Sequence, residues 1–131
     1  NLIIALEAIL ISDEKQEITN KICLRLATLI SQKGRLSLYN DAKRLFKIRG
    51  KIVHGSFVSD GVAPAKDETF RELYNLRVIA SFCLINYVKL LQNKLNNEEI
   101  IKLLDESILN EEKNISLKKM TTDTFPFFDY K

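Results

Sequence analysis

The residues best suited to chemistry lie at the end of one basic segment, residues 40–55. This segment contains the only histidine of the chain, His54, and places Arg49 five residues before it. Imidazole is the side chain that most readily transfers protons near neutral pH, and a guanidinium group holds phosphate charge. The pair therefore suits the handling of a phosphodiester. By itself an Arg and a His at this spacing form a weak signal, because chance supplies such a pair often.

The helix that must position these residues is predicted from about residue 38 to residue 53. Ser37 is suited to its N-cap, and its apolar residues recur every three or four positions. They are Leu38, Ala42, Leu45, Ile48 and Ile52. In an ideal helix five residues span about 140° of rotation and about 7.5 Å of rise, so Arg49 and His54 do not stack on one face. We expect them to converge only if the helix ends or distorts near His54, where Gly55 permits a change of direction.

Four further helices are predicted from the same periodicity. They are helix 1–11, a helix that ends at about residue 32, helix 68–95 after a loop at 55–67, and a short helix that ends at about residue 109. Residues suited to helix N-termini precede three of them: Asp13 with Gln16, Asp67, and Asn96 with Glu99. Strand alternation is not apparent. The sequence predicts an all-α, up-and-down bundle of about five helices over residues 1–109, with the aromatic tail, residues 110–131, packed on it.

Apolar spacing also predicts which faces are buried. In helix 68–95 we expect a buried stripe of Phe70, Leu73, Tyr74, Ala80, Cys83, Leu84, Tyr87, Val88 and Leu91. Glu7 interrupts the apolar first helix. It lies either at the edge of the apolar stripe or in a pair with a base of a neighbouring helix, for which Arg25 is a candidate; we favour the pair. Arg77 interrupts the long stripe. It is either another partner for Glu7 or a second phosphate contact.

Charge in this chain is unevenly distributed. The net charge of its 131 residues is +3, but residues 1–66 carry 11 basic and 6 acidic side chains. A local basic patch of this kind is a weak indication of an anionic partner, and a solvated helix face is the default interpretation.

Cys23 and Cys83 each lie inside an apolar helical run, which indicates buried, reduced thiols and a cytoplasmic protein. One histidine and two such cysteines cannot assemble a metal-ligand cluster, so we expect no metal and no other cofactor. The longest apolar run, residues 2–11, is too short to cross a bilayer, and we expect no membrane association. The chain begins with Asn1 rather than Met, which fits a piece of a longer protein.

Three segments carry a resemblance to a known family. They are Leu6-Glu7-Ala8, Arg25-Leu26-Ala27, and Leu45-Phe46-Lys47-Ile48-Arg49-Gly50-Lys51-Ile52-Val53-His54-Gly55. Together they resemble the HEPN superfamily, specifically its Apea-like branch, over about residues 2–95. The resemblance implies a helical bundle that dimerises and brings an Arg-x4–6-His signature face to face across the two-fold axis. It also implies RNA as substrate, and a toxin–antitoxin or anti-phage setting with an antitoxin or further domains as partners.

Arg49 and His54 are the residues that match the signature. By the resemblance, His54 is the acid or base and Arg49 stabilises the developing negative charge. An imidazole deprotonates a 2′-hydroxyl, which attacks the adjacent phosphate and leaves a 2′,3′-cyclic phosphate. Two copies of His54, one per subunit, would supply both the acid and the base. Lys47, Lys51 and Arg44 would contact the flanking RNA backbone.

Three hypotheses remain open from the sequence. The first is a metal-independent endoribonuclease that acts as a homodimer. The second is a non-catalytic HEPN module that binds RNA or nucleotide and dimerises within a larger protein. Gly50 stands where family members commonly have a polar residue, which favours the second hypothesis. The third is a helical scaffold, which a salt-bridged Arg49 and an averted His54 would support.

Overall fold

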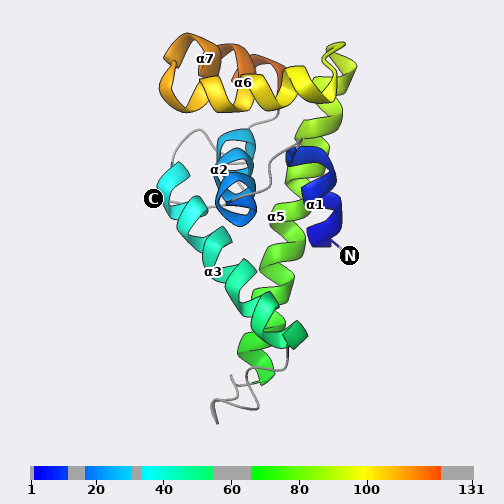
Figure 1. Cartoon of the computed structure of the whole chain (residues 1–131), viewed down its shortest axis with the longest axis vertical. Coiled ribbons are helices and arrows are strands. Elements are labelled where there is room, and N and C mark those ends of the chain that lie inside the picture. The colour runs from blue at the N-terminus through cyan, green and yellow to red at the C-terminus, as the bar shows by residue number, and fades with distance from the viewer. Residues whose placement is uncertain (1, 12–16, 31–33, 55–65, 122–131) are drawn as a thin grey trace.

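The chain is an all-α helical bundle, as its sequence predicts. The computed structural model describes residues 2–11, 17–30, 34–54 and 66–121, with the side chains of residues 2, 49–54 and 66–69 outside the described part. Six helices, and no strands, occur in these ranges (Figure 1). They are α1 (Leu2–Leu10), α2 (Ile18–Ile30), α3 (Arg35–His54), α5 (Lys66–Gln92), α6 (Asn97–Leu109) and α7 (Glu111–Met120).

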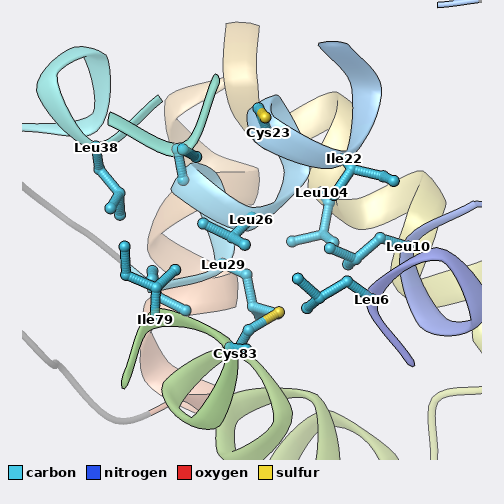
Figure 2. Close-up of a cluster of buried hydrophobic side chains, with 14 of the residues drawn as sticks. Leu6, Leu10, Ile22, Cys23, Leu26, Leu29, Leu38, Ile79, Cys83 and Leu104 are labelled. Carbon is cyan, nitrogen blue, oxygen red and sulfur yellow. The ribbon is translucent and has the colours of Figure 1, made fainter. Parts of the chain in front are cut away.

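Helix α2 is the centre of the bundle, because α1, α3, α5 and α6 all contact it. Its buried leucines, Leu26 and Leu29, pack among Leu6, Ile79 and Leu104 from three neighbouring helices (Figure 2). The long helix α5 runs the length of the molecule, and the α6–α7 pair lies across one end (Figure 1). Among the described residues, none of the helices combines the length and the apolar character needed to cross a bilayer.

Helix boundaries follow local backbone chemistry. The prediction that Ser37 caps the third helix is wrong, since α3 begins two residues earlier, at Arg35. Gly34 precedes it with φ 67°, a left-handed conformation that suits glycine, and its carbonyl accepts from the Leu38 amide at 3.0 Å. Helix α5 ends at Gln92, three residues before the predicted end. Lys94, with φ 66°, cannot continue a right-handed helix.

Two capping predictions have different outcomes. The capping box of Asn96 and Glu99 is confirmed: the Asn96 side chain accepts from the Glu99 amide at 2.8 Å, and the Glu99 carboxylate accepts from the Asn96 amide at 3.2 Å. The box expected at Asp13 and Gln16 lies outside the described residues.

Helix α7 was not predicted by the fading apolar pattern after Asn110. The Asn110 side chain caps it by accepting from the Lys113 amide at 3.0 Å, and Leu117 is fully buried against the bundle. Lys118 donates to the Thr28 carbonyl of α2 at 2.7 Å. Met120 is also partly buried against the core, and Lys113 pairs with Glu106 of α6 at 3.6 Å. These tertiary contacts, and not a regular apolar stripe, hold α7 on the bundle. The aromatic residues 125–130 of the predicted tail lie outside the described residues.

The predicted buried stripe of α5 is wrong for most of its length. Phe70, Leu73, Tyr74, Val88 and Leu91 are exposed, whereas the core contains Leu76, Ile79, Ala80, Cys83 and Leu90. Both faces of this helix are apolar, so periodicity alone does not decide which one packs inward. Contacts with α1, α2 and α3 select the face that includes Ile79 and Cys83.

Candidate functional site

Both residues of the predicted signature lie in α3. Its backbone is helical through His54, so a stretch of regular helix separates Arg49 from His54. Five residues of helix correspond to about 140° of rotation and about 7.5 Å of rise. The backbone of one chain therefore does not bring the two residues together. Their side chains lie outside the described residues, and the prediction that they converge stays a prediction.

Contacts between α3 and α5 fix where this segment lies in the bundle. Arg44 Nη1 is 2.7 Å from Glu72 Oε1, so the middle of α3 is tied to the first half of α5. Since α3 continues past Arg44 toward the beginning of α5, residues 49–54 lie at one end of the molecule, beside the first turns of α5 (Figure 1). The candidate site is thus at the end opposite the α6–α7 pair.

Arg44, predicted to contact RNA, has a structural bond as well. Its guanidinium pairs with Glu72 at 2.7 Å and with Asp41 at 3.8 Å. The Glu72 carboxylate is largely buried, and its second oxygen, Oε2, has no hydrogen-bond partner among the described residues. An Arg that is paired with a buried carboxylate contributes to the stability of the fold. Its guanidinium is therefore less available to bind a phosphate.

Lysines give α3 its basic outer face. Lys43 and Lys47 are exposed and four residues apart, so they lie on the same side of the helix. Lys43 Nζ is 5.3 Å from the centre of the Tyr39 ring, a cation–π contact, and the Tyr39 hydroxyl donates to Asn20 of α2. Lys51 is four residues further along α3, and its side chain lies outside the described residues. Of the three predicted RNA contacts, Lys47 is therefore the one with a described, exposed ammonium group.

The two cysteines are buried and free, and neither is suited to nucleophilic chemistry. Burial raises the pKa of Cys83 from 9.0 to about 12. Burial also raises the pKa of Cys23 to about 12, against a smaller opposite effect of the Lys43 charge. Both thiols are therefore protonated at neutral pH, where the reactive species is the thiolate. Within the described ranges, no three His, Cys, Asp or Glu residues lie close enough to hold a metal ion.

The expected pair between Glu7 and Arg25 is wrong. Glu7 is exposed, and the buried Arg25 pairs with Asp105 of α6, with Nε 2.8 Å from Oδ1 and Nη2 2.9 Å from Oδ2. Arg25 also donates through Nη1 to the Leu10 carbonyl at the end of α1. The partner is 80 residues away in the sequence, and no local pattern marks Asp105 among the acids of α6.

Two asparagine amides, one buried and one half-buried, join helices and were not predicted. Asn86 is fully buried in α5 and donates to the Leu29 carbonyl at 3.2 Å. Asn97, at the start of α6, donates to the Ile9 carbonyl at 3.0 Å and to the Tyr87 hydroxyl at 2.9 Å. Each satisfies polar groups inside the bundle, which is a structural role.

Arg77, the other cation singled out in the sequence, is exposed on α5. It lines a shallow hollow of about 300 Å³ together with Tyr74, Val78, Ser81, Phe82 and Ile85. All of these residues belong to one helix. Arg77 therefore lies on an apolar outer face of α5, away from the lysines of α3.

Comparison with known proteins adds no relative: no family model, curated protein or solved structure matches the chain.

Proposed function

We propose that this chain is a metal-independent endoribonuclease domain of the HEPN type that acts as a homodimer in the cytoplasm. His54 would serve as acid or base, and Arg49 would stabilise the developing negative charge on the phosphate. The observation that carries the proposal is the continuity of α3. The same helix carries the exposed Lys43 and Lys47 and ends at His54, which has the only imidazole of the chain. Such a lysine row supplies RNA affinity that does not depend on base sequence.

A second subunit completes the proposed site. Cyclising cleavage needs a base for the 2′-hydroxyl and an acid for the leaving oxygen. One chain contains one histidine, and regular helix separates it from Arg49. Two subunits that share a cleft supply two imidazoles and two guanidinium groups. The setting that we propose, a toxin–antitoxin or anti-phage system, makes an inhibitory antitoxin or additional domains the expected partners.

The alternative is a non-catalytic HEPN module that binds RNA or nucleotide through α3 and dimerises within a larger protein. Gly50 favours it, because it stands in the signature where the resemblance implies a polar residue. The Arg44 ion pair with Glu72 does not distinguish the two, since both use Arg44 on the RNA backbone.

RNA cleavage in EDTA distinguishes the two. The endoribonuclease proposal predicts products with 2′,3′-cyclic phosphate ends from the native chain and none from a His54→Ala variant. Binding of RNA by both proteins without cleavage by either would support the alternative.

A further inference from the structure

Helix α5 has two apolar faces, and the bundle covers one of them. The inner face contains Ile79, Cys83 and Leu90, all fully buried. On the opposite side Phe70 is 63% exposed and Tyr74 is 67% exposed. A helix at the surface of a globular protein normally carries polar residues on its outer side, whereas a helix that is apolar all round is covered all round. No part of the bundle that the structure describes therefore covers the outer face of α5.

We define the outer α5 surface by its exposed large apolar side chains. They are Phe70, Leu73, Tyr74, Ile85, Val88 and Leu91. The surface extends over 22 residues of helix, from Phe70 to Leu91, which is roughly 30 Å. A large aromatic side chain offers about 150–250 Å², so the exposed two-thirds of Phe70 and Tyr74 provide roughly 250 Å² between them. With four more apolar side chains the surface approaches the roughly 800 Å² per partner of a stable interface.

Four of the six residues of this surface are arranged symmetrically about the position of Ile79. Phe70 is nine residues before it, and Val88 is nine residues after it. Leu73 and Ile85 are each six residues away, on either side. At the centre, Arg77 and Ser81 are each two residues away. A two-fold axis at the level of Ile79, on the outer side of the helix, therefore places these four apolar residues opposite apolar residues, and Arg77 opposite a hydroxyl. By the same count Tyr74 corresponds to Leu84, and Leu91, at the end of the surface, corresponds to Asp67.

From this arrangement we propose that the outer α5 surface binds a second copy of the chain, with the two α5 helices packed antiparallel about that axis. A two-fold interface uses the same patch on both subunits and must be self-complementary, as this patch is. Ser81 Oγ donates to the Arg77 carbonyl of its own helix at 2.8 Å. Its oxygen lone pairs remain able to accept from Arg77 of the partner subunit.

This interface goes beyond the proposed function, because it is not the one that would join two catalytic segments. The Arg44–Glu72 pair places residues 49–54 beyond the first turns of α5, on one side of Ile79. In an antiparallel pair the two copies of that segment lie on opposite sides of the axis. A chain that uses only the α5 interface forms a dimer. A chain that uses both forms a closed tetramer when the two axes intersect at right angles, and a longer assembly otherwise.

Sedimentation of the purified chain at micromolar concentrations tests the proposal. We expect a native mass of two chains or more, and half that mass or less in a Tyr74→Lys/Ile85→Lys variant, whose dissociation constant at the α5 contact rises by about tenfold or more. Leu109→Lys is the matched control, since Leu109 is 93% exposed on α6 and lies off the surface. It should leave the mass unchanged. A native mass of one chain, or a native mass kept by the double variant, would overturn the proposal.

Two further measurements keep the outcome interpretable. Circular dichroism must show equal helix content in all variants; if the double variant is misfolded, Val88→Glu replaces it with the same expectation. Single-cysteine additions test the register: an equimolar mixture of Arg77→Cys and Ser81→Cys should form intermolecular disulfides faster than either variant alone. Equal rates would contradict the antiparallel packing. RNA cleavage reports separately on the proposed function, since it requires His54 and not the outer α5 surface.

Discussion

Arg25 of α2 and Asp105 of α6 form a two-point ion pair that joins the centre of the bundle to the α6–α7 end. The two N–O distances are 2.8 and 2.9 Å, and the Arg25 residue is only 4% exposed. A third bond, from Nη1 to the Leu10 carbonyl, ties the same guanidinium to α1. Three helices therefore depend on one cation.

Loss of this cation should destabilise the fold. Removal of one partner of a buried pair costs about 3–5 kcal/mol, and we expect about 3 kcal/mol for Arg25→Met because the Asp105 side chain is 48% exposed. Urea denaturation followed by circular dichroism measures the free energy of unfolding. The control is Lys102→Ala, which removes an exposed pair with Glu106 and should cost less than about 0.5 kcal/mol. Equal losses of unfolding free energy in the two variants would contradict a stabilising role of the Arg25–Asp105 pair.

The lysines of α3 should affect RNA affinity without affecting stability. Each lysine that contacts a phosphate contributes about one unit to the salt dependence of binding. We therefore expect Lys43→Ala/Lys47→Ala to lower the slope of log K against log salt by about one to two, with an unchanged unfolding midpoint. Arg44→Ala should instead lower the midpoint, because it leaves the Glu72 carboxylate unpaired. If the double substitution leaves RNA affinity and its salt dependence unchanged, α3 is not part of the RNA-binding surface.

Cap chemistry at α6 gives a smaller, more local effect. Asn96→Ala removes the side-chain acceptor of the Glu99 amide and should cost about 1 kcal/mol. Asn96→Ser keeps an acceptor and should cost less. Thermal unfolding of the two variants measures both losses. A larger loss for Asn96→Ala than for Asn96→Ser shows that the hydrogen bond matters, whereas equal losses would contradict this explanation.

The buried thiols should react slowly in the folded chain. With a pKa of about 12, Cys83 and Cys23 have a far smaller thiolate fraction at pH 8 than thiols of the ordinary value, 9.0. Alkylation by iodoacetamide at pH 8 should therefore be at least about a hundredfold slower than in the urea-unfolded chain. Mass spectrometry of the intact chain gives both rates, and rapid modification of the folded protein would contradict the burial.

The same pKa values define a pH dependence of stability. Because folding raises the pKa, the unfolded thiols ionise above pH 9 while the folded ones stay protonated up to about pH 12. The contribution of the two thiols to the free energy of unfolding is complete below pH 9 and falls as the pH rises from 9 to about 12. Replacement of Cys83 by Ala should reduce the alkaline loss of unfolding free energy relative to its value at pH 8.

Local patterns predicted those parts of the fold that local chemistry decides. The Asn96–Glu99 box starts a helix through bonds within four residues, and the apolar spacing of Ile22, Leu26 and Leu29 indicates a buried face. The inward face of α5 could not be predicted, since both of its faces are apolar and only the neighbouring helices choose between them. Helix α7 depends on Leu117 and Lys118, whose contacts are tertiary.

In the candidate site, too, local sequence predicts the exposure of a side chain but not its tertiary partner. The exposure of Lys47 follows from its place opposite the buried Leu45 side of α3. The bond between Arg44 and Glu72 joins two helices across a connecting segment, and the partner of Arg25 is 80 residues away, so neither pair has a local signature.

Cleavage of a defined RNA by the purified chain in EDTA, with end analysis of the products, tests the endoribonuclease proposal. His54→Ala and Arg49→Ala are the test variants, and Lys102→Ala, on the distant helix α6, is the control prepared in the same way. We predict 2′,3′-cyclic phosphate ends with the native chain and the control, and loss of cleavage in both test variants. Cleavage that survives His54→Ala, or no cleavage by the native chain, would contradict the endoribonuclease proposal.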